Sequence, residues 1–261
     1  MGRLAMLMRI PPPDRRWDAD FITLRRLLAQ DTFGTLVSLE SHFDRYKAPG
    51  TLKQSWRAEP VPGNGILFDL GSHLVDQVLV LFGLPSRVFA SVRDERVASQ
   101  VPTAGWGEKG FIDDTFDAML FYDTPPEGID ASKRGFIVKL SATTTSLCKR
   151  QMRYVVRGVK AGYNKYGLDP QENQTKGGMG PAKAGFGVET EKEWGTLTTA
   201  EGSVKVKSED GSYKSLFENV AQALLGKAEL EVKASQAADV IRVLNLLGKS
   251  SREGKVLEVR K

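Results

Sequence analysis

The fold and the candidate chemistry of this chain turn on the stretch Gly63-Asn64-Gly65-Ile66-Leu67-Phe68-Asp69-Leu70-Gly71-Ser72-His73-Leu74-Val75-Asp76-Gln77. Because a helix turns by about 100° per residue, one side of this stretch and its continuation is apolar, through Ile66, Leu70, Leu74, Val78 and Leu81. A second side gathers three polar residues, Asp69, His73 and Asp76. The pattern predicts an amphipathic helix that begins near Gly65 and ends at Gly83.

Asp69 and His73 form the candidate catalytic pair. They are four residues apart, so their side chains can meet on a helix. A carboxylate beside an imidazole selects one tautomer and favours the protonated ring. Such a pair suits a general base that removes a hydroxyl proton while hydride leaves the same carbon. By spacing alone such a pair is most often a solvated helix face or a local hydrogen bond, and Val80 interrupts the polar side.

The rest of the chain predicts an α+β fold. A helical pattern starts at Asp18, and two further helices are expected over residues 213–225 and 234–247. Residues 167–195 hold many glycines and few apolar side chains, which predicts a long surface loop. Short β-type runs are expected at residues 36–43, 88–93, 115–122, 136–143, 152–156 and 256–259. The short spacing of the early runs favours antiparallel neighbours, and helices beside such a sheet make an α+β layer.

Composition excludes several classes of protein. The chain has 261 residues, 41% of them hydrophobic, which is enough for a sizeable core. The net charge is +5, and the lysines and arginines are spread among 32 acidic residues. We therefore expect no nucleic-acid-binding surface. Cys148 is the only cysteine, which rules out an internal disulfide or a thiol cluster for zinc and fits a reducing compartment. No run of eighteen apolar residues occurs, so we expect no membrane span and a cytoplasmic location.

Two glycine-containing motifs do not match known phosphate-binding loops. Gly105-Trp106-Gly107-Glu108-Lys109-Gly110 has the spacing of a dinucleotide motif, but no strand precedes it and no helical period follows it. Gly248-Lys249-Ser250 lacks the earlier glycine of a P-loop, because Val243 stands there. We therefore expect no cofactor-binding residues and no metal ligands in this chain.

The central helix nevertheless resembles one found in the Gfo/Idh/MocA oxidoreductases. Gly63-Asn64-Gly65 followed by Asp69, His73 and Asp76 is similar to that family's G-G-G-x-x-x-D-x-x-x-H-x-x-D helix, and residues 15–21, 40–46 and 165–172 are similar to other stretches of it. The resemblance implies a C-terminal-type substrate-binding and association domain over residues 14–261, after an irregular lead at 1–13. It implies a broad, mainly antiparallel, mixed sheet with helices on one face. His73 would be the acid/base and Asp69 its neighbour.

The resemblance also implies a small sugar or polyol substrate. Eight residues are candidates for binding it: Arg16, Trp17, Asp44, Arg45, Tyr46, Asp76, Lys165 and Tyr166. For several of them a purely structural role remains open. Residues 15–17 would then form a surface arm, residues 44–46 a strand end in solvent, and residues 165–166 a turn at the sheet edge.

One departure from the family pattern sets the functional expectation. Family members begin with a domain that binds NAD or NADP, and this sequence starts downstream of it. We therefore expect the substrate half of an NAD(P)-dependent oxidoreductase that binds no cofactor alone, is inactive alone, and forms a homo-oligomer through the free sheet face. The second hypothesis is a non-catalytic association or regulatory module derived from the same family.

Overall fold

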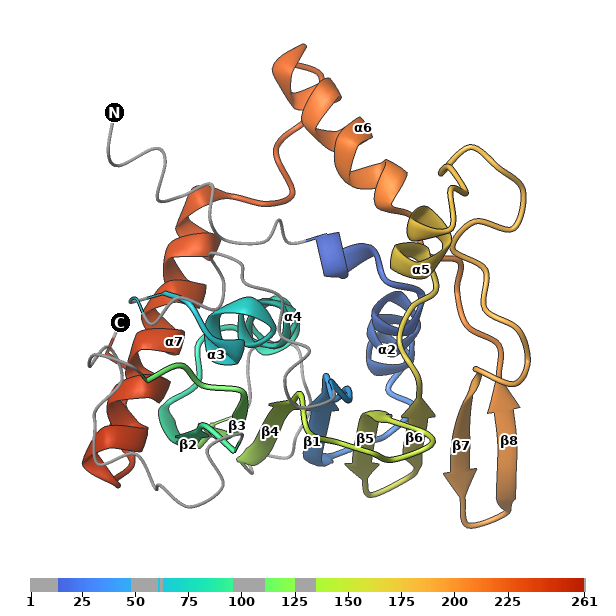
Figure 1. Ribbon diagram of the computed structural model, residues 1–261. Helices are drawn as coiled ribbons and strands as arrows, with labels where there is room; N and C mark the ends of the chain where they lie inside the picture. Colours follow the sequence, from blue (N-terminus) through green and yellow to red (C-terminus); the bar gives the residue numbers. More distant parts are fainter. Residues whose placement is uncertain (1–13, 48–60, 62, 96–110, 125–134, 261) are drawn as a thin grey trace.

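A computed structural model describes residues 14–47, 61, 63–95, 111–124 and 135–260. The predicted lead at 1–13 and the glycine motif at 105–110 lie outside the described residues. The elements form one nine-stranded sheet with helices above one of its faces (Figure 1). This is the α+β architecture that the sequence predicts.

The sheet is mixed, with the strand order β8-β7-β6-β5-β1-β4-β3-β2-β9. Only the pair β1–β4 is parallel among the described ladders, and every other pair is antiparallel. The strands are β1 (Leu36–His42), β2 (Arg87–Arg93), β3 (Thr115–Tyr122), β4 (Phe136–Thr143), β5 (Met152–Gly158), β6 (Gly162–Tyr166), β7 (Gly195–Thr199), β8 (Gly202–Val206) and β9 (Leu257–Glu258).

The helices lie on one side of this sheet (Figure 1). They are η1 (Asp14–Trp17), α2 (Ala19–Ala29), α3 (Ile66–Asp69), α4 (Gly71–Phe82), α5 (Gln171–Lys176), α6 (Tyr213–Leu224) and α7 (Ala234–Glu253). Helix α7 packs against β2 and α4 through buried aliphatic side chains, Val240, Val243, Leu244 and Leu247. None of the helices in the described ranges is long and apolar enough to cross a membrane.

The prediction of a long loop over residues 167–195 is only partly right. Helix α5 interrupts it, and the Asp169 carboxylate accepts hydrogen bonds from the amides of Ala19 and Gln171 at 2.7 and 2.8 Å, which ties this region to α2. Strands β6, β7 and β8 were not predicted, because Gly162, Gly195 and the polar run of β8 carry little hydrophobic alternation.

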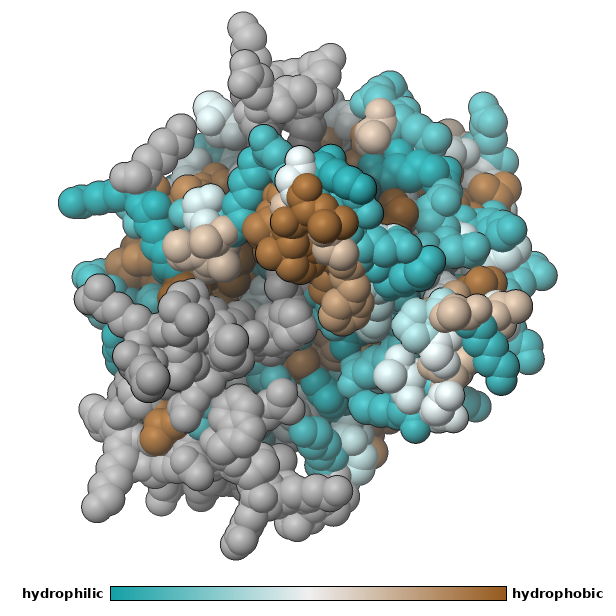
Figure 2. Space-filling view, turned by 90° about the horizontal axis from the view of Figure 1, so that it is seen from above, coloured by the Kyte–Doolittle hydropathy of each residue, from teal (hydrophilic) through white to brown (hydrophobic). Residues whose placement is uncertain are grey.

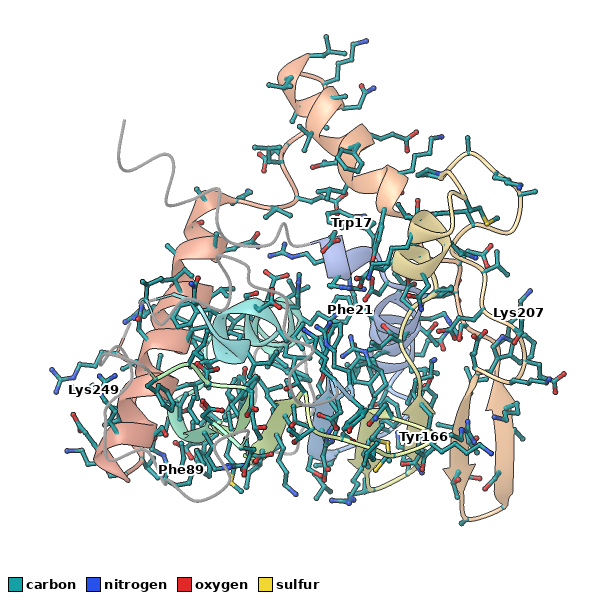
Figure 3. The ribbon with its side chains drawn as sticks, in the orientation of Figure 1. Trp17, Phe21, Phe89, Tyr166, Lys207 and Lys249 are labelled. Carbon is teal, nitrogen blue, oxygen red and sulfur yellow. The ribbon has the colours of Figure 1, made fainter. Side chains whose placement is uncertain are left out.

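The described helices cover one face of the sheet and not the other. Trp17 and Phe21 lie among the helices, whereas Phe89 points from the opposite face of β2 (Figure 3). Helix α6 projects away from the sheet, and the view down onto the helix side shows a hydrophobic patch near its centre, where α6 stands (Figure 2). Phe217 and Leu224 of this helix are 69% and 84% exposed. The apolar face of α6 is therefore only partly used by the fold.

Candidate functional site

The predicted central helix is present but is divided in two. Helix α3 ends at Asp69 and α4 begins at Gly71, while Leu70 between them keeps right-handed helical angles. The amide of His73 donates to the carbonyl of Leu70 at 3.1 Å, so the two pieces remain joined by hydrogen bonds. Gly83 ends α4, as predicted. The first turn of α4 therefore carries His73.

His73 lies in a buried, charged environment. Its ring is stacked on Phe43 with 6.5 Å between ring centroids, and its Nδ1 lies 3.9 Å from Oδ1 of Asp14. Asp69 is the last residue of α3, and its catalytic role stays a prediction. Burial, followed by the positive charges of Arg15 and Arg153, lowers the pKa of His73 to about 3. The expectation that a carboxylate would favour the protonated ring is wrong, because desolvation and arginines outweigh it.

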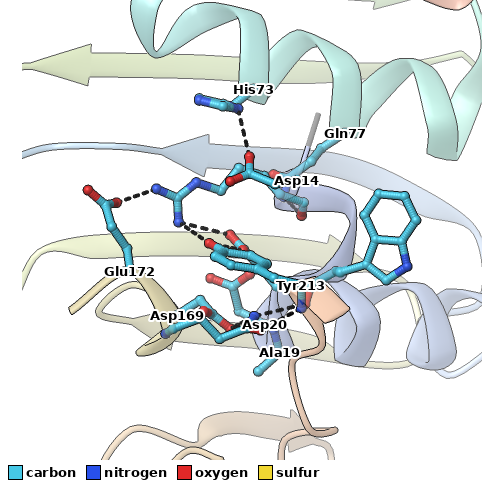
Figure 4. A network of polar contacts seen from close by, with 12 residues as sticks. Asp14, Ala19, Asp20, His73, Gln77, Asp169, Glu172 and Tyr213 are labelled. Atoms are coloured by element: carbon cyan, nitrogen blue, oxygen red, sulfur yellow. Dashed lines mark hydrogen bonds and ion pairs between the residues drawn. The ribbon is translucent and has the colours of Figure 1, made fainter. Parts of the chain in front are cut away.

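Arg15 contacts three other parts of the site, among them Glu172 and Tyr213, which are labelled in Figure 4. Its guanidinium donates to the carboxylate of Glu172 on α5 and, at 2.9 Å, to the hydroxyl of Tyr213 on α6. It also lies over the Phe43 ring at 5.2 Å. Neither Glu172 nor Tyr213 is a site residue predicted from the sequence. Helical spacing could not have found them, because they lie at least 157 residues away from Arg15 along the chain.

Two buried polar atoms beside His73 have no hydrogen-bond partner. They are Oδ1 of Asp14, an acceptor, and Nε of Arg15, a donor. Buried polar atoms are normally paired, since leaving one unmet costs about 1–3 kcal/mol. An unmet acceptor 3.9 Å from the imidazole and an unmet donor on the following residue make this cluster a candidate site for a hydroxylated ligand.

Arg16 and Asp76, both proposed as substrate-binding residues, bind each other. The guanidinium donates two hydrogen bonds to the Asp76 carboxylate, at 2.7 and 2.5 Å. It also donates to the carbonyl of Glu231 and the side-chain oxygen of Gln236, each at 3.1 Å. The pair forms one wall of a small cavity of about 80 Å³ between α4 and α7. In this structure Arg16 thus fastens η1 to α4 and α7.

Arg153 is a second buried arginine that binds several partners, and it was not predicted from the sequence. Its guanidinium donates to Asp20 on α2 at 2.8 Å and to the side-chain oxygen of Gln77 on α4 at 2.9 Å. It lies 5.8 Å from the centre of the same Phe43 ring that packs on His73. A lone arginine in a predicted strand gives no sequence signal of this role. Its side chain is 1% exposed and places a positive charge near the imidazole.

The other predicted substrate residues do not gather at one point. Lys165 is fully buried and pairs with Glu189 at 2.9 Å. Tyr166 is half-buried and stacks under Arg150, while Tyr46 is 47% exposed and forms a β-bridge with Thr145.

Asp44, Arg45 and Trp17 are the closer candidates. Asp44 lies 3.7 Å from His42, and Arg45 lies over the Phe43 ring at 5.4 Å. Trp17 is buried, and its carbonyl accepts a hydrogen bond from Gln171 at 3.1 Å. Phe43 also packs on His73, so one aromatic ring lies between Arg45 and the candidate site.

The glycine-flanked start of α3 is already occupied by a side chain of this protein. It has the form of an anion site, but the carboxylate of Asp113 fills it, accepting the amide of Leu67 at 2.6 Å. In the same described ranges, no group of three or more His, Cys, Asp or Glu side chains is arranged to hold a metal ion. The cluster around His73 provides an imidazole, the carboxylate of Asp14 and the guanidinium of Arg15.

A mixed nine-stranded sheet with helices above one face is also the architecture of solved oxidoreductase structures that this chain matches. The chain belongs to the Gfo/Idh/MocA family, because residues 25–259 match the family described as "Oxidoreductase family, C-terminal alpha/beta domain". A solved oxidoreductase structure from Yersinia pestis superimposes with a TM-score of 0.78 at 32% identity, over 95% of this chain and 64% of that one.

Curated relatives agree with this assignment. An uncharacterized oxidoreductase of Schizosaccharomyces pombe, C115.03, is 34% identical over 94% of this chain and 66% of its own length. The Bacillus subtilis scyllo-inositol 2-dehydrogenase (NADP(+)) IolW is 28% identical over 94% of this chain and 62% of its own length. The chain thus spans about two thirds or less of these relatives.

The Arg16–Asp76 pair gives a test of stability. Replacing Arg16 with alanine leaves Asp76, whose side chain is 8% exposed, as a buried unpaired charge. We expect the free energy of unfolding in urea to fall by about 3–5 kcal/mol. The matched control Arg87→Ala breaks an exposed pair with Asp123 and should cost less than about 1 kcal/mol. Equal losses in the two variants would mean that the buried pair does not hold η1 in place.

The depressed pKa of His73 predicts how stability changes with pH. The unfolded chain takes up a proton near pH 6.5, whereas the folded chain resists it down to about pH 3. The stability from this group is therefore complete above pH 6.5 and is lost as pH falls toward 3, by at most about 1.4 kcal/mol per unit. Subtracting the unfolding curve of His73→Gln from that of the wild type should isolate this slope, and His42→Gln should retain it. A flat difference would contradict the buried, neutral imidazole.

Proposed function

We propose that this chain is the substrate-binding half of an NAD(P)-dependent oxidoreductase acting on a sugar or polyol, with His73 handling the hydroxyl proton. The observation that carries the proposal is a buried, neutral imidazole on the family's characteristic helix, within 3.9 Å of the Asp14 carboxylate. A general base must be unprotonated at working pH, and His73 meets this condition. Burial, followed by the charges of Arg15 and Arg153, lowers the pKa of the ring and makes it a weak base in the chain as described.

The polar atoms beside the ring support a polyhydroxylated ligand. A hydroxyl group both donates and accepts, so it could accept from Nε of Arg15 and donate to Oδ1 of Asp14, two buried atoms without partners. The relative IolW acts on scyllo-inositol, a compound that carries such groups on every carbon. Arg45, beside Phe43, is the candidate that would extend the site.

The nucleotide would be held by residues outside those described. Asp113 occupies the glycine-flanked helix start, and the sequence carries no phosphate-binding turn in a strand–turn–helix context. In the reaction we propose, a carbinol loses hydride and a proton, and the part of this chain is to orient the carbinol and accept the proton. Asp69 and Asp76 remain candidates for the site only by resemblance.

Polyol binding to the chain alone tests this proposal. We expect scyllo-inositol to shift the imidazole NMR signals of His73 in the wild-type protein, because the ligand would enter beside the ring. Arg15→Met should weaken the apparent affinity at least tenfold, which corresponds to the loss of about 1.4 kcal/mol. Arg87→Ala, remote from the cluster, should bind like the wild type.

Two outcomes would count against the proposal. Unchanged His73 signals at saturating scyllo-inositol, and at comparable concentrations of a panel of hexoses and pentitols, would remove the substrate assignment. Reduction of NAD+ or NADP+ by the purified chain and a polyol, read at 340 nm, would overturn our expectation that the chain is inactive alone.

Association through the open sheet face is a second proposal, and it also supports the alternative of a non-catalytic module. On the face opposite the helices, Phe89 lies directly across from Met119, and Phe121 lies across from Ile137. Met119 and Ile137 are 39% and 36% exposed, and charged side chains such as Lys139 surround them. An apolar centre with a polar rim is the usual anatomy of a protein interface.

Sedimentation velocity tests this association. We expect the wild type to sediment as a dimer or larger species, and Met119→Glu/Ile137→Glu to sediment as a monomer, because it places charges in the apolar centre. The control Leu224→Glu alters an 84% exposed side chain on α6, on the helix side, and should sediment like the wild type. A monomeric wild type, or loss of assembly only in the α6 control, would refute the use of the sheet face.

A further inference from the structure

The start of the His73 helix is held from outside the helix. Helix α3 has only four residues, and Gly65 at its N-cap provides no side-chain cap. The first amides of a helix have no partner within it. Here the amide of Ile66 donates to the carbonyl of Asp113 at 3.1 Å, and the amide of Leu67 donates to its carboxylate at 2.6 Å. Both orphan donors are thus satisfied by one residue that precedes β3.

Gly65 is shaped to admit this carboxylate. Its φ of 92° lies where side chains are rarely tolerated, and a Cβ at this position would lie 2.1 Å from Oδ1 of Asp113. Gly63 has a similar φ of 89°, but a Cβ there would meet nothing within 4 Å. The two glycines therefore differ, since only Gly65 is in contact with the carboxyl group.

The position of α3 determines the position of His73 through backbone hydrogen bonds. The amide of Leu70 donates to the carbonyl of Ile66 at 2.9 Å, and that of His73 donates to the carbonyl of Leu70 at 3.1 Å. A four-residue helix is not stable by itself, because nucleation is costly. Whatever holds the amides of Ile66 and Leu67 therefore sets where the first turn of α4 begins.

We propose that Asp113 is the positioning residue of the candidate site, holding the helix that carries His73 so that the imidazole stays buried between Phe43 and Asp14. It acts through the backbone of α3 and does not touch the ring. The inference deepens the proposed function by naming how its proton-handling group is held. Burial of Asp113 against the helix start raises its pKa to about 7, consistent with a side chain fixed by its surroundings.

Histidine NMR on the full chain tests this role, because the sequence has only two histidines and His42→Gln assigns them. In the wild type we expect the His73 signal to remain that of a neutral ring down to pH 4. In Asp113→Ala, the freed helix start should let water reach the ring and raise the pKa of His73 by at least one unit. Asp113→Asn should restore the wild-type titration, because its side-chain oxygen can still accept the Leu67 amide.

Two controls separate positioning from simple stability. Asp117→Ala removes an exposed carboxylate of β3 paired with Arg93 and should leave the His73 titration unchanged. If Asp113→Ala does not fold, Gly65→Ala, which pushes the carboxylate off the amides, should raise the His73 pKa, whereas Gly63→Ala should not. Loss of thermal stability without a pKa shift in Asp113→Ala, or in Gly65→Ala, would overturn the proposal. No polyol is used, so a failure here is distinct from failure of the substrate assignment.

Discussion

The structure depends on buried ion pairs that fasten the first two helices to the rest of the domain. Arg16 on η1 binds Asp76 on α4, and Arg153 on β5 binds Asp20 on α2. Each pair joins segments at least 60 residues apart. Such pairs cost desolvation energy and are stable only when their hydrogen bonds are satisfied, which fixes the geometry closely. They bring Asp14 and Arg15 next to His73.

The same charges define the chemistry that the site can perform. Arginines that secure the fold also surround the imidazole and, after burial, lower its pKa. A neutral imidazole beside a carboxylate and a guanidinium is suited to exchanging a proton with a hydroxyl group. Family membership through residues 25–259 agrees with an oxidoreductase role, and the helices lie on one face of the sheet only.

Much of the fold could be predicted from periodicity. Strands β3 and β4 were predicted to the residue, and the His73 helix was predicted from Gly65 to Gly83. Strands β6 to β8 escaped prediction because their glycines and polar side chains carry no alternation that distinguishes a strand from a loop. They are strands because each has a neighbour in the sheet to pair with, which is a nonlocal cause.

The sequence by itself determined the α+β class, the amphipathic helix and the presence of His73 on its polar side, because these follow from contacts within a few residues. Only the tertiary structure decided that Asp14 lies beside the imidazole, that Arg16 and Asp76 bind each other, and that Asp113 caps the helix. Burial and charge at a site are sums over groups distant in the chain. A pKa that sequence spacing predicts to rise can therefore fall once the chain is folded.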